Sequence, residues 1–169
     1  MPENLNGVAF AEWTDAPTTV DGWKKQLAEQ CHVFEEPPMP SVPGKFPASG
    51  VVVLEDDGRV WVVSPSNAFA GYVNTFAKGK QDPGLCLRST ATKEGFEESG
   101  LKVELTGYLC DSVRSTTVTR YYTAKRVGGT PSAMGWESQR VSLVPSTQLA
   151  SFVTHPNDHV VLQALKALP

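Results

Sequence analysis

The sequence predicts an α/β or α+β fold in which a mixed β-sheet lies between helices. Short runs of β-branched residues alternate along the chain with longer segments whose apolar residues recur at helical spacing. Turn-forming residues separate the two kinds of segment, and we find no internal repeat or low-complexity tract. Strands interleaved with helices are typical of a sheet covered on both faces, so we expect three layers of helix, sheet and helix.

The composition is that of an ordinary globular protein with one main domain. The chain has 169 residues, of which 40% are hydrophobic and 20% are charged. A net charge of −3 gives no global positive field, so neither nucleic acid nor an anionic membrane is an expected partner. A polyanionic ligand therefore needs a local cluster of cations or a metal ion.

Cysteine usage and the apolar stretches indicate a cytoplasmic protein. The three cysteines, Cys31, Cys86 and Cys110, are odd in number and lack the spacing of a disulfide framework or a zinc site. The N-terminus lacks the pattern of a signal peptide. The longest apolar runs, such as residues 51–54, are much shorter than a membrane span.

Residues 1–48 are predicted to form an N-terminal extension, and residues 49–169 the main domain. In the extension, Asp21 suits the N-cap of a helix that ends near Cys31. Four prolines between residues 35 and 44 exclude a helix there and favour an extended strap. The two tryptophans of the extension are unfavourable in water, so we expect this segment to pack on the main domain.

The main domain opens with a predicted hairpin and continues as alternating strands and helices. Asp56-Asp57-Gly58 is a strong turn signal between two β-branched runs. A helix is predicted at residues 85–99, where Gly100 suits a left-handed C-terminal cap, and a second helix begins at Pro156. Strands are predicted at residues 51–55, 59–63, 72–76, 102–110, 117–127 and 138–144.

Three acidic residues of the predicted helix 85–99 form its most informative feature. Glu94, Glu97 and Glu98 stand at positions i, i+3 and i+4, so their carboxylates share one face of the helix. Phe96 points away from them and is a candidate anchor in the core, and Gly95 disfavours the helix by about 1 kcal/mol. A hard divalent cation such as Mg²⁺ or Mn²⁺ relieves the repulsion, because both prefer oxygen ligands. The simpler alternative is a solvated acidic face.

A glycine-punctuated loop precedes this helix and carries two lysines. Residues 75–84 include Lys78 and Lys80 on either side of Gly79. Backbone amides and lysines at that position suit phosphate oxygens bound beside the cation.

These residues resemble the Nudix box, which reads G-x5-E-x7-R-E-U-x-E-E-x-G-U with U aliphatic. Residues 79–101 match it at Gly79, Glu94, Glu97, Glu98, Gly100 and Leu101. The resemblance implies a Nudix fold, an α/β/α sandwich with a central mixed sheet, in which the three glutamates hold Mg²⁺, or Mn²⁺ in its place. It also implies a small-molecule substrate with a phosphoanhydride bond, cleaved by attack of water on phosphorus.

The box departs from its pattern at three positions. Leu85 stands where the family has its first glutamate, Lys93 where it has arginine, and Gly95 where it has an aliphatic residue. In the family, that glutamate and arginine brace the loop against the helix. Leu85 and Lys93 motivate an alternative, a catalytically weak or inactive Nudix-like module that binds a nucleotide. The intact glutamates favour an enzyme.

Further candidates complete the predicted site. The catalytic base is Glu98 or Glu137, and the alternatives stay open. Candidates for contact with the phosphates of the substrate are Lys78, Gly79, Lys80, Arg114 and Arg120. Aromatic residues that suit stacking on a planar group, or else the core, are Phe76, Tyr121, Tyr122 and Trp136.

The sequence suits several classes of phosphoanhydride substrate. A nucleoside diphosphate derivative such as ADP-ribose or a nucleotide sugar is preferred, with a dinucleoside polyphosphate second and nucleoside triphosphates third. His155 and His159 are interpreted as structural or exposed, because no further zinc ligands accompany them. Relatives are often homodimers, although no feature of this sequence requires a dimer interface.

Overall fold

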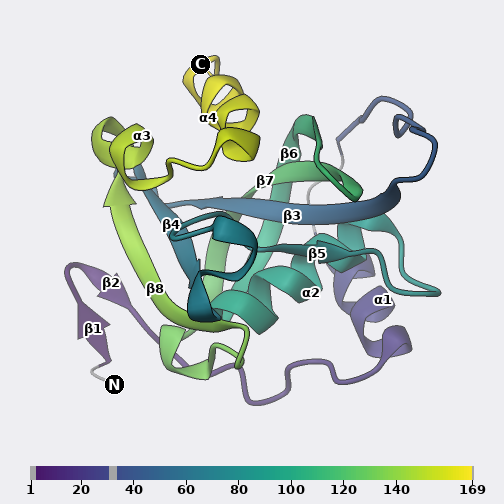
Figure 1. Ribbon diagram of the computed structural model, residues 1–169. Coiled ribbons are helices and arrows are strands. Elements are labelled where there is room, and N and C mark those ends of the chain that lie inside the picture. Colours follow the sequence, from purple (N-terminus) through teal and green to yellow (C-terminus); the bar gives the residue numbers. More distant parts are fainter. Residues whose placement is uncertain (1–2, 31–33, 169) are drawn as a thin grey trace.

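A mixed β-sheet forms the centre of the protein, with helices on both sides of it (Figure 1). The computed structural model describes residues 3–30 and 34–168. The sheet has six strands in the order β6-β7-β3-β4-β8, and β5 pairs with β3 beside this path. The strands are β3 Phe46–Leu54, β4 Arg59–Pro65, β5 Lys78–Lys80, β6 Leu101–Val113, β7 Thr117–Gly129 and β8 Ser138–Pro145. The predicted fold class is confirmed.

Helices of different length cover the two faces of the sheet. Figure 1 shows α2 on one side of β3, and α3 and α4 on the other. The helices are α1 Val20–Ala28, α2 Leu87–Ser99, α3 Leu149–Phe152 and α4 His159–Lys166, with 3₁₀ turns at Ser66–Gly71, Pro131–Ala133, Ser146–Gln148 and Pro156–Asp158. An N-terminal hairpin joins β1 Asn4–Leu5 to β2 Val8–Ala9. No helix in the described part of the chain is long and apolar enough to cross a membrane.

Alternation along β3 divides the core into two clusters. Val51 and Val53 face α2 and pack with Ala91. Val52 faces the opposite side and packs in the cluster that includes Leu162 of α4. The continuous apolar run at residues 51–54 is therefore explained by the burial of β3 on both of its faces.

The two edges of β3 have different partners, and this difference positions the site. One edge pairs in parallel with β7 from Phe46↔Thr117 to Leu54↔Lys125. The other edge meets β4 at Leu54↔Val60, next to the predicted hairpin turn, and β5 at its opposite end. The segment before and including β5 therefore lies between β3 and β4.

The predicted strand at residues 72–76 is wrong. The strand instead begins at Lys78, and Thr75 forms an isolated bridge with Val63 of β4, with both backbone hydrogen bonds at 2.9 Å. Asn74 is held by side-chain bonds, since it accepts from Ser64 Oγ at 2.8 Å and donates to the Phe152 carbonyl at 2.9 Å. These tertiary contacts exclude a regular strand before Thr75.

The N-terminal extension packs against α2. Trp13 lies edge-on to both Phe96 of α2 and Trp23 of α1, with ring centroids 5.0 and 5.7 Å apart. Phe96 therefore meets the extension rather than the central core. Thr19, not Asp21, caps α1, because its hydroxyl accepts from the Gly22 amide at 3.1 Å. The predicted end of this helix, Cys31, lies outside the described residues.

Candidate active site

Two of the three glutamates on α2 lie against the backbone of β5. The Glu94 side chain packs directly on Gly79, where any Cβ would overlap its carboxylate. Glu98 Oε2 accepts a hydrogen bond from the Lys78 amide at 3.0 Å. Glu97, more exposed than either, turns towards Lys93 instead. The helix face predicted from the spacing therefore adjoins the lysine-bearing segment that precedes it in the sequence.

Close packing of α2 on the sheet brings these carboxylates into place. A Cβ on Gly95 would lie 3.0 Å from Val51 Cγ2 and 3.5 Å from Val103 Cγ2, so the small residue permits a short distance between helix and sheet. Gly100 ends the helix with φ of 72°, as predicted. The unfavourable Gly95 thus has an explanation in packing.

Burial makes the charged forms of two glutamates unfavourable. Burial first, and then the neighbouring Glu98, raise the pKa of Glu94 to about 8. Burial also raises the pKa of Glu98 to about 7, although the charge and backbone amide of Lys78 oppose that shift. The exposed Glu137 lies close enough to raise the pKa of both. The second candidate base is therefore part of the same electrostatic cluster.

Lys93 lies at the centre of a network of three carboxylates. Its Nζ is 2.7 Å from Glu97 Oε2, 3.0 Å from Asp82 Oδ2 and 3.6 Å from Glu94 Oε1. Burial lowers the pKa of Lys93, but hydrogen bonds to Glu97 and Asp82 outweigh burial and leave the pKa above its usual value. Asp82 was not among the predicted site residues, because it lies in a loop with no periodic relation to the helix.

The donor set suits a hard divalent cation. Glu94, Glu97 and Glu98 offer oxygen donors only, and burial, together with neighbouring carboxylates, raises the pKa of Glu94 and Glu98. Over residues 3–30 and 34–168, no group of three or more His, Cys, Asp or Glu side chains is already arranged around a metal position. Each carboxylate is instead directed to its own partner: Gly79, Lys93 or the Lys78 amide.

A cavity of about 190 Å³ brings together four of the predicted substrate-binding residues. Lys78, Gly79, Lys80 and Arg114 line it, together with hydroxyl groups of residues 115–117. The Lys78 side chain lies 4.6 Å above the ring of Tyr72, and burial lowers its pKa. The cavity therefore begins at the strand whose other face contacts Glu94.

Buried hydrogen bonds hold Arg114 at this cavity. Its guanidinium donates to Asp158 Oδ1 at 2.6 Å, to the Tyr72 hydroxyl at 2.6 Å and to the Tyr121 hydroxyl at 2.8 Å. Asp158 is fully buried and also accepts from the Thr75 hydroxyl at 2.8 Å. This network links the sheet to the start of α4. Of its members, the sequence singles out Arg114 as a phosphate contact and Tyr121 as an aromatic for stacking or the core, but not the contacts between them.

Arg120 is separated from this group by its own contacts. It is 2% exposed, and its Nε and one terminal nitrogen each donate at 2.8 Å to Asp111. The other donors reach the carbonyl oxygens of Pro37 and Pro38 at 2.8 and 3.3 Å. Arg120 therefore does not lie with the other candidates. It binds the proline-rich strap to the sheet instead.

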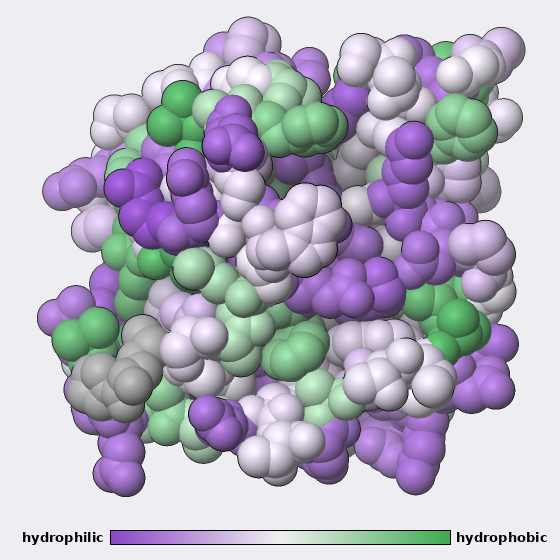
Figure 2. Space-filling model, turned by 60° about the horizontal axis from the view of Figure 1, so that its bottom comes forward, coloured by the Kyte–Doolittle hydropathy of each residue, from purple (hydrophilic) through white to green (hydrophobic). Residues whose placement is uncertain are grey.

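The four candidate stacking residues divide by exposure. Phe76, Tyr121 and Tyr122 are fully buried and belong to the core. Trp136 is 85% exposed. Apolar and polar side chains are interspersed over the face of the molecule that Figure 2 shows. Sequence reasoning missed Phe69, which is 78% exposed and lines the cavity that contains Lys78.

His155 makes structural contacts, whereas His159 is exposed. His155 stacks on Tyr72 with ring centroids 3.8 Å apart, and its Nδ1 accepts from the Asn157 amide at 3.2 Å. His159 begins α4. Of the described cysteines, Cys86 caps α2, and burial raises the pKa of Cys110 to about 12.

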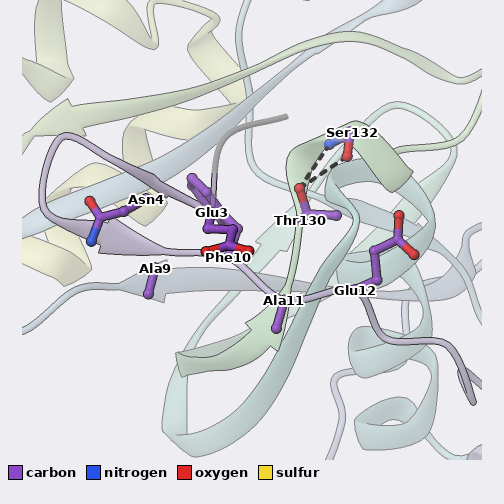
Figure 3. Close-up of a pocket in the computed structure, with 8 residues that line it drawn as sticks. All are labelled: Glu3, Asn4, Ala9, Phe10, Ala11, Glu12, Thr130 and Ser132. Atoms are coloured by element: carbon purple, nitrogen blue, oxygen red, sulfur yellow. Dashed lines mark hydrogen bonds between the residues drawn. The ribbon is translucent and has the colours of Figure 1, made fainter.

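A larger pocket is lined by none of the glutamates of α2. Its volume is about 690 Å³, and its lining comes from the N-terminal hairpin and the loop after β7 (Figure 3). Two acidic residues, Glu3 and Glu12, border it, and none of the predicted site residues does. The cavity beside β5 is therefore the one associated with the candidate chemistry.

Comparisons with known proteins agree with the fold and the box. The family model described as "NUDIX domain" matches residues 44–165. No curated protein matches the chain.

Solved structures with a similar fold include a NUDIX hydrolase from Nitrosomonas europaea, with 13% identity over 72% of this chain and 86% of that chain, and a TM-score of 0.60. An Ap4A hydrolase from C. elegans has 15% identity over 72% and 96% of the two chains, and a TM-score of 0.57. An ADP-ribose pyrophosphatase from Streptococcus suis has 14% identity over 73% and 93%, and a TM-score of 0.54.

Proposed function

The chain belongs to the NUDIX family, and on that premise we propose that it is a Mg²⁺-dependent pyrophosphohydrolase. The observation that carries the proposal is the packing of the buried Glu94 and the half-buried Glu98 against the backbone of Lys78 and Gly79. Two acids with raised pKa values, next to a third on the same helix face, form a site that a divalent cation stabilises. A solvated acidic face does not require that burial.

In this proposal Glu94, Glu97 and Glu98 hold Mg²⁺, for which Mn²⁺ can substitute. A bound divalent cation neutralises phosphate charge and lowers the pKa of a bound water. The oxygen of water then forms a bond to phosphorus, and the bridging P–O bond breaks. A carboxylate accepts the proton of the water, with Glu98 and Glu137 as the two candidates.

The cations beside β5 bind the phosphates of the substrate. Lys78 and Lys80 flank Gly79, and Arg114 lies behind them in the same cavity. Opposite charge at short range holds the phosphates at β5, the strand whose backbone also contacts Glu94 and Glu98. Arg120 has no part in this proposal, because Asp111 and the strap engage its donors.

The proposed substrate is a nucleoside diphosphate derivative, of the ADP-ribose or nucleotide-sugar type, or a dinucleoside polyphosphate. Similar structures include proteins named as an ADP-ribose pyrophosphatase, an Ap4A hydrolase and a UDP-X diphosphatase. Fold alone does not choose among these substrates, because specificity depends on residues outside the box.

Hydrolysis of a panel of phosphoanhydrides with Mg²⁺ tests the proposal. We expect turnover of at least one compound, and a loss of about 100-fold or more in kcat for Glu97→Gln, equivalent to about 2.7 kcal/mol. Glu29→Gln, on the exposed end of α1, is the matched control and should retain activity. Tight nucleotide binding without turnover would instead support a binding module, the alternative motivated by Leu85 and Lys93.

A comparison of Glu98→Gln with Glu137→Gln identifies the base. Both variants remove a carboxylate from the same cluster, but the true base also sets the acidic limb of the pH–rate profile. We expect that limb to disappear in one variant and to persist in the other.

A further inference from the structure

The loop before α2 lacks the carboxylate that the box pattern places at residue 85. Leu85 occupies that position and is 4% exposed, so it packs in the core instead of bracing the loop by charge. Asp82, three residues earlier, places its Oδ2 3.0 Å from Lys93 Nζ. The ion pair between Asp82 and Lys93 therefore connects this loop to α2, with the acid at a different position from that of the family's first glutamate.

Hydrogen bonds on both sides hold Asp82 in place. The Gln81 amide donates to the Pro47 carbonyl of β3 at 3.0 Å, and the Leu85 amide donates to the Asp82 carbonyl at 3.1 Å. The Gln81 side chain also donates to the Leu85 carbonyl at 2.6 Å. Because the turn is anchored to the sheet, the backbone that carries the partly exposed Asp82 carboxylate is held in place.

Lys93 is shared between Asp82 and two candidate metal ligands. Its ammonium lies 2.7 Å from Glu97 and 3.6 Å from Glu94, and its side chain is 19% exposed. Lys93 therefore supplies positive charge where the proposed cation would bind. An ammonium and a divalent cation compete for the same carboxylate oxygens.

We infer that Asp82 is a positioning residue that acts through Lys93, holding the ammonium between the loop and Glu97 and away from Glu94, so that Glu94 stays available to a divalent cation. This inference rests on the proposed function. Asp82 contacts neither the proposed cation nor the substrate, and its effect depends on the presence of Lys93.

Opposite effects are expected when either partner is removed. In Asp82→Asn, the ammonium is left to Glu97 and Glu94, so a divalent cation binds more weakly, by roughly tenfold, as is usual for the loss of an outer partner. In Lys93→Met, which keeps the apolar stem, the competitor is removed and the cation binds more tightly. Asp82→Glu keeps the charge and should restore binding to within about threefold of the wild type.

Titration of the full chain with Mn²⁺, without substrate, tests the inference by isothermal calorimetry and by the paramagnetic signal of free Mn²⁺. In the double variant Asp82→Asn/Lys93→Met, we expect the affinity of Lys93→Met alone, because Asp82 then has nothing to act through. Asp57→Asn, which breaks the surface pair with Arg59, is the matched control and should leave Mn²⁺ binding unchanged.

The outcomes separate this inference from the proposed function. Wild-type Mn²⁺ affinity in Asp82→Asn, or the same weakening in the Lys93→Met background, would overturn the positioning role while leaving the hydrolase intact. A lower Tm with unchanged Mn²⁺ affinity would reduce Asp82 to a structural brace and would also overturn it. No saturable Mn²⁺ binding by the wild type would overturn both.

Discussion

Gly79 determines how closely Glu94 approaches β5, because the strand has no Cβ at the point of contact. An added methyl group would overlap the Glu94 carboxylate, which is itself confined by α2. We expect Gly79→Ala to destabilise the fold by about 1–3 kcal/mol and to abolish most of the stabilisation that Mg²⁺ provides. Urea unfolding with and without Mg²⁺ measures both effects.

Gly128 offers a matched control on β7. A Cβ there meets only the Lys102 side chain at 3.6 and 3.7 Å, which is ordinary contact. Gly128→Ala should therefore change the free energy of unfolding by less than about 1 kcal/mol and leave the response to Mg²⁺ intact. Equal effects of the two substitutions would contradict the assigned role of Gly79.

The pH dependence of stability follows from Glu94 and Glu98. Their pKa values of about 8 and about 7 exceed the value of about 4.3 in an unfolded chain. Between these values the folded state binds more protons than the unfolded state, so the contribution of both groups to the free energy of unfolding falls as pH rises from about 4.3 to 8.

Magnesium should reverse this trend, because carboxylates bind a cation in their deprotonated form. We expect the increase in Tm caused by Mg²⁺ to be larger at pH 8.5 than at pH 5.5, and to be reduced at both in Glu94→Gln. An increase in Tm that does not vary with pH would count against these two residues as metal ligands.

Residue spacing predicts the shared helix face of Glu94, Glu97 and Glu98, because helical geometry is local. It does not reveal Asp82 or Asp158, whose contacts depend on how distant segments meet. Arg114 and Arg120 look equivalent in the sequence, yet one lies at the cavity and the other under the strap. Only tertiary structure separates them.

Arg120 joins the proline-rich strap to β7, so a substitution of Arg120 tests how much this contact between two segments stabilises the fold. Arg120→Gln removes the partner of Asp111 and the donors to the strap carbonyls, so we expect a loss of about 3–5 kcal/mol in the free energy of unfolding. KM should remain unchanged at temperatures where the variant is folded. Denaturant unfolding and steady-state kinetics measure the two quantities.

Arg59→Gln is the control for Arg120, because its pair with Asp57 lies at the surface, where solvent screens an ion pair. A large increase in KM for Arg120→Gln, with the free energy of unfolding unchanged, would indicate that Arg120 binds the substrate after all.

Most elements of the main domain are predictable from local pattern. The hairpin at Gly58, the helix that ends at Gly100 and the long strands β6 and β7 follow from turn residues and periodicity. The strand β5 was predicted several residues too early, because its position depends on the gap between β3 and β4. The N-cap of α1 falls on Thr19, since Asp21 lies inside the first turn of the helix.

At the scale of the molecule, the extension and α2 share one aromatic cluster. Trp23 is 3% exposed and lies beside Phe96, so its loss should leave a cavity under α1. We expect Trp23→Ala to lower the free energy of unfolding by about 3–5 kcal/mol. Trp136→Ala, at a site that is 85% exposed, should change it by less than about 0.5 kcal/mol.

Fluorescence-detected unfolding suits both tryptophan variants. Similar midpoints for Trp23→Ala and the wild type would show that the extension adds little to the stability of the main domain.

The parallel pairing of β3 with β7 has a consequence for biosynthesis. Phe46 pairs with Thr117, so about 70 further residues must leave the ribosome before β3 finds that neighbour. Until then, a nascent chain carries an apolar strand with an open edge, which favours aggregation and slow maturation. Chains that terminate before residue 125 should accumulate in inclusion bodies even though the whole Nudix box is already translated.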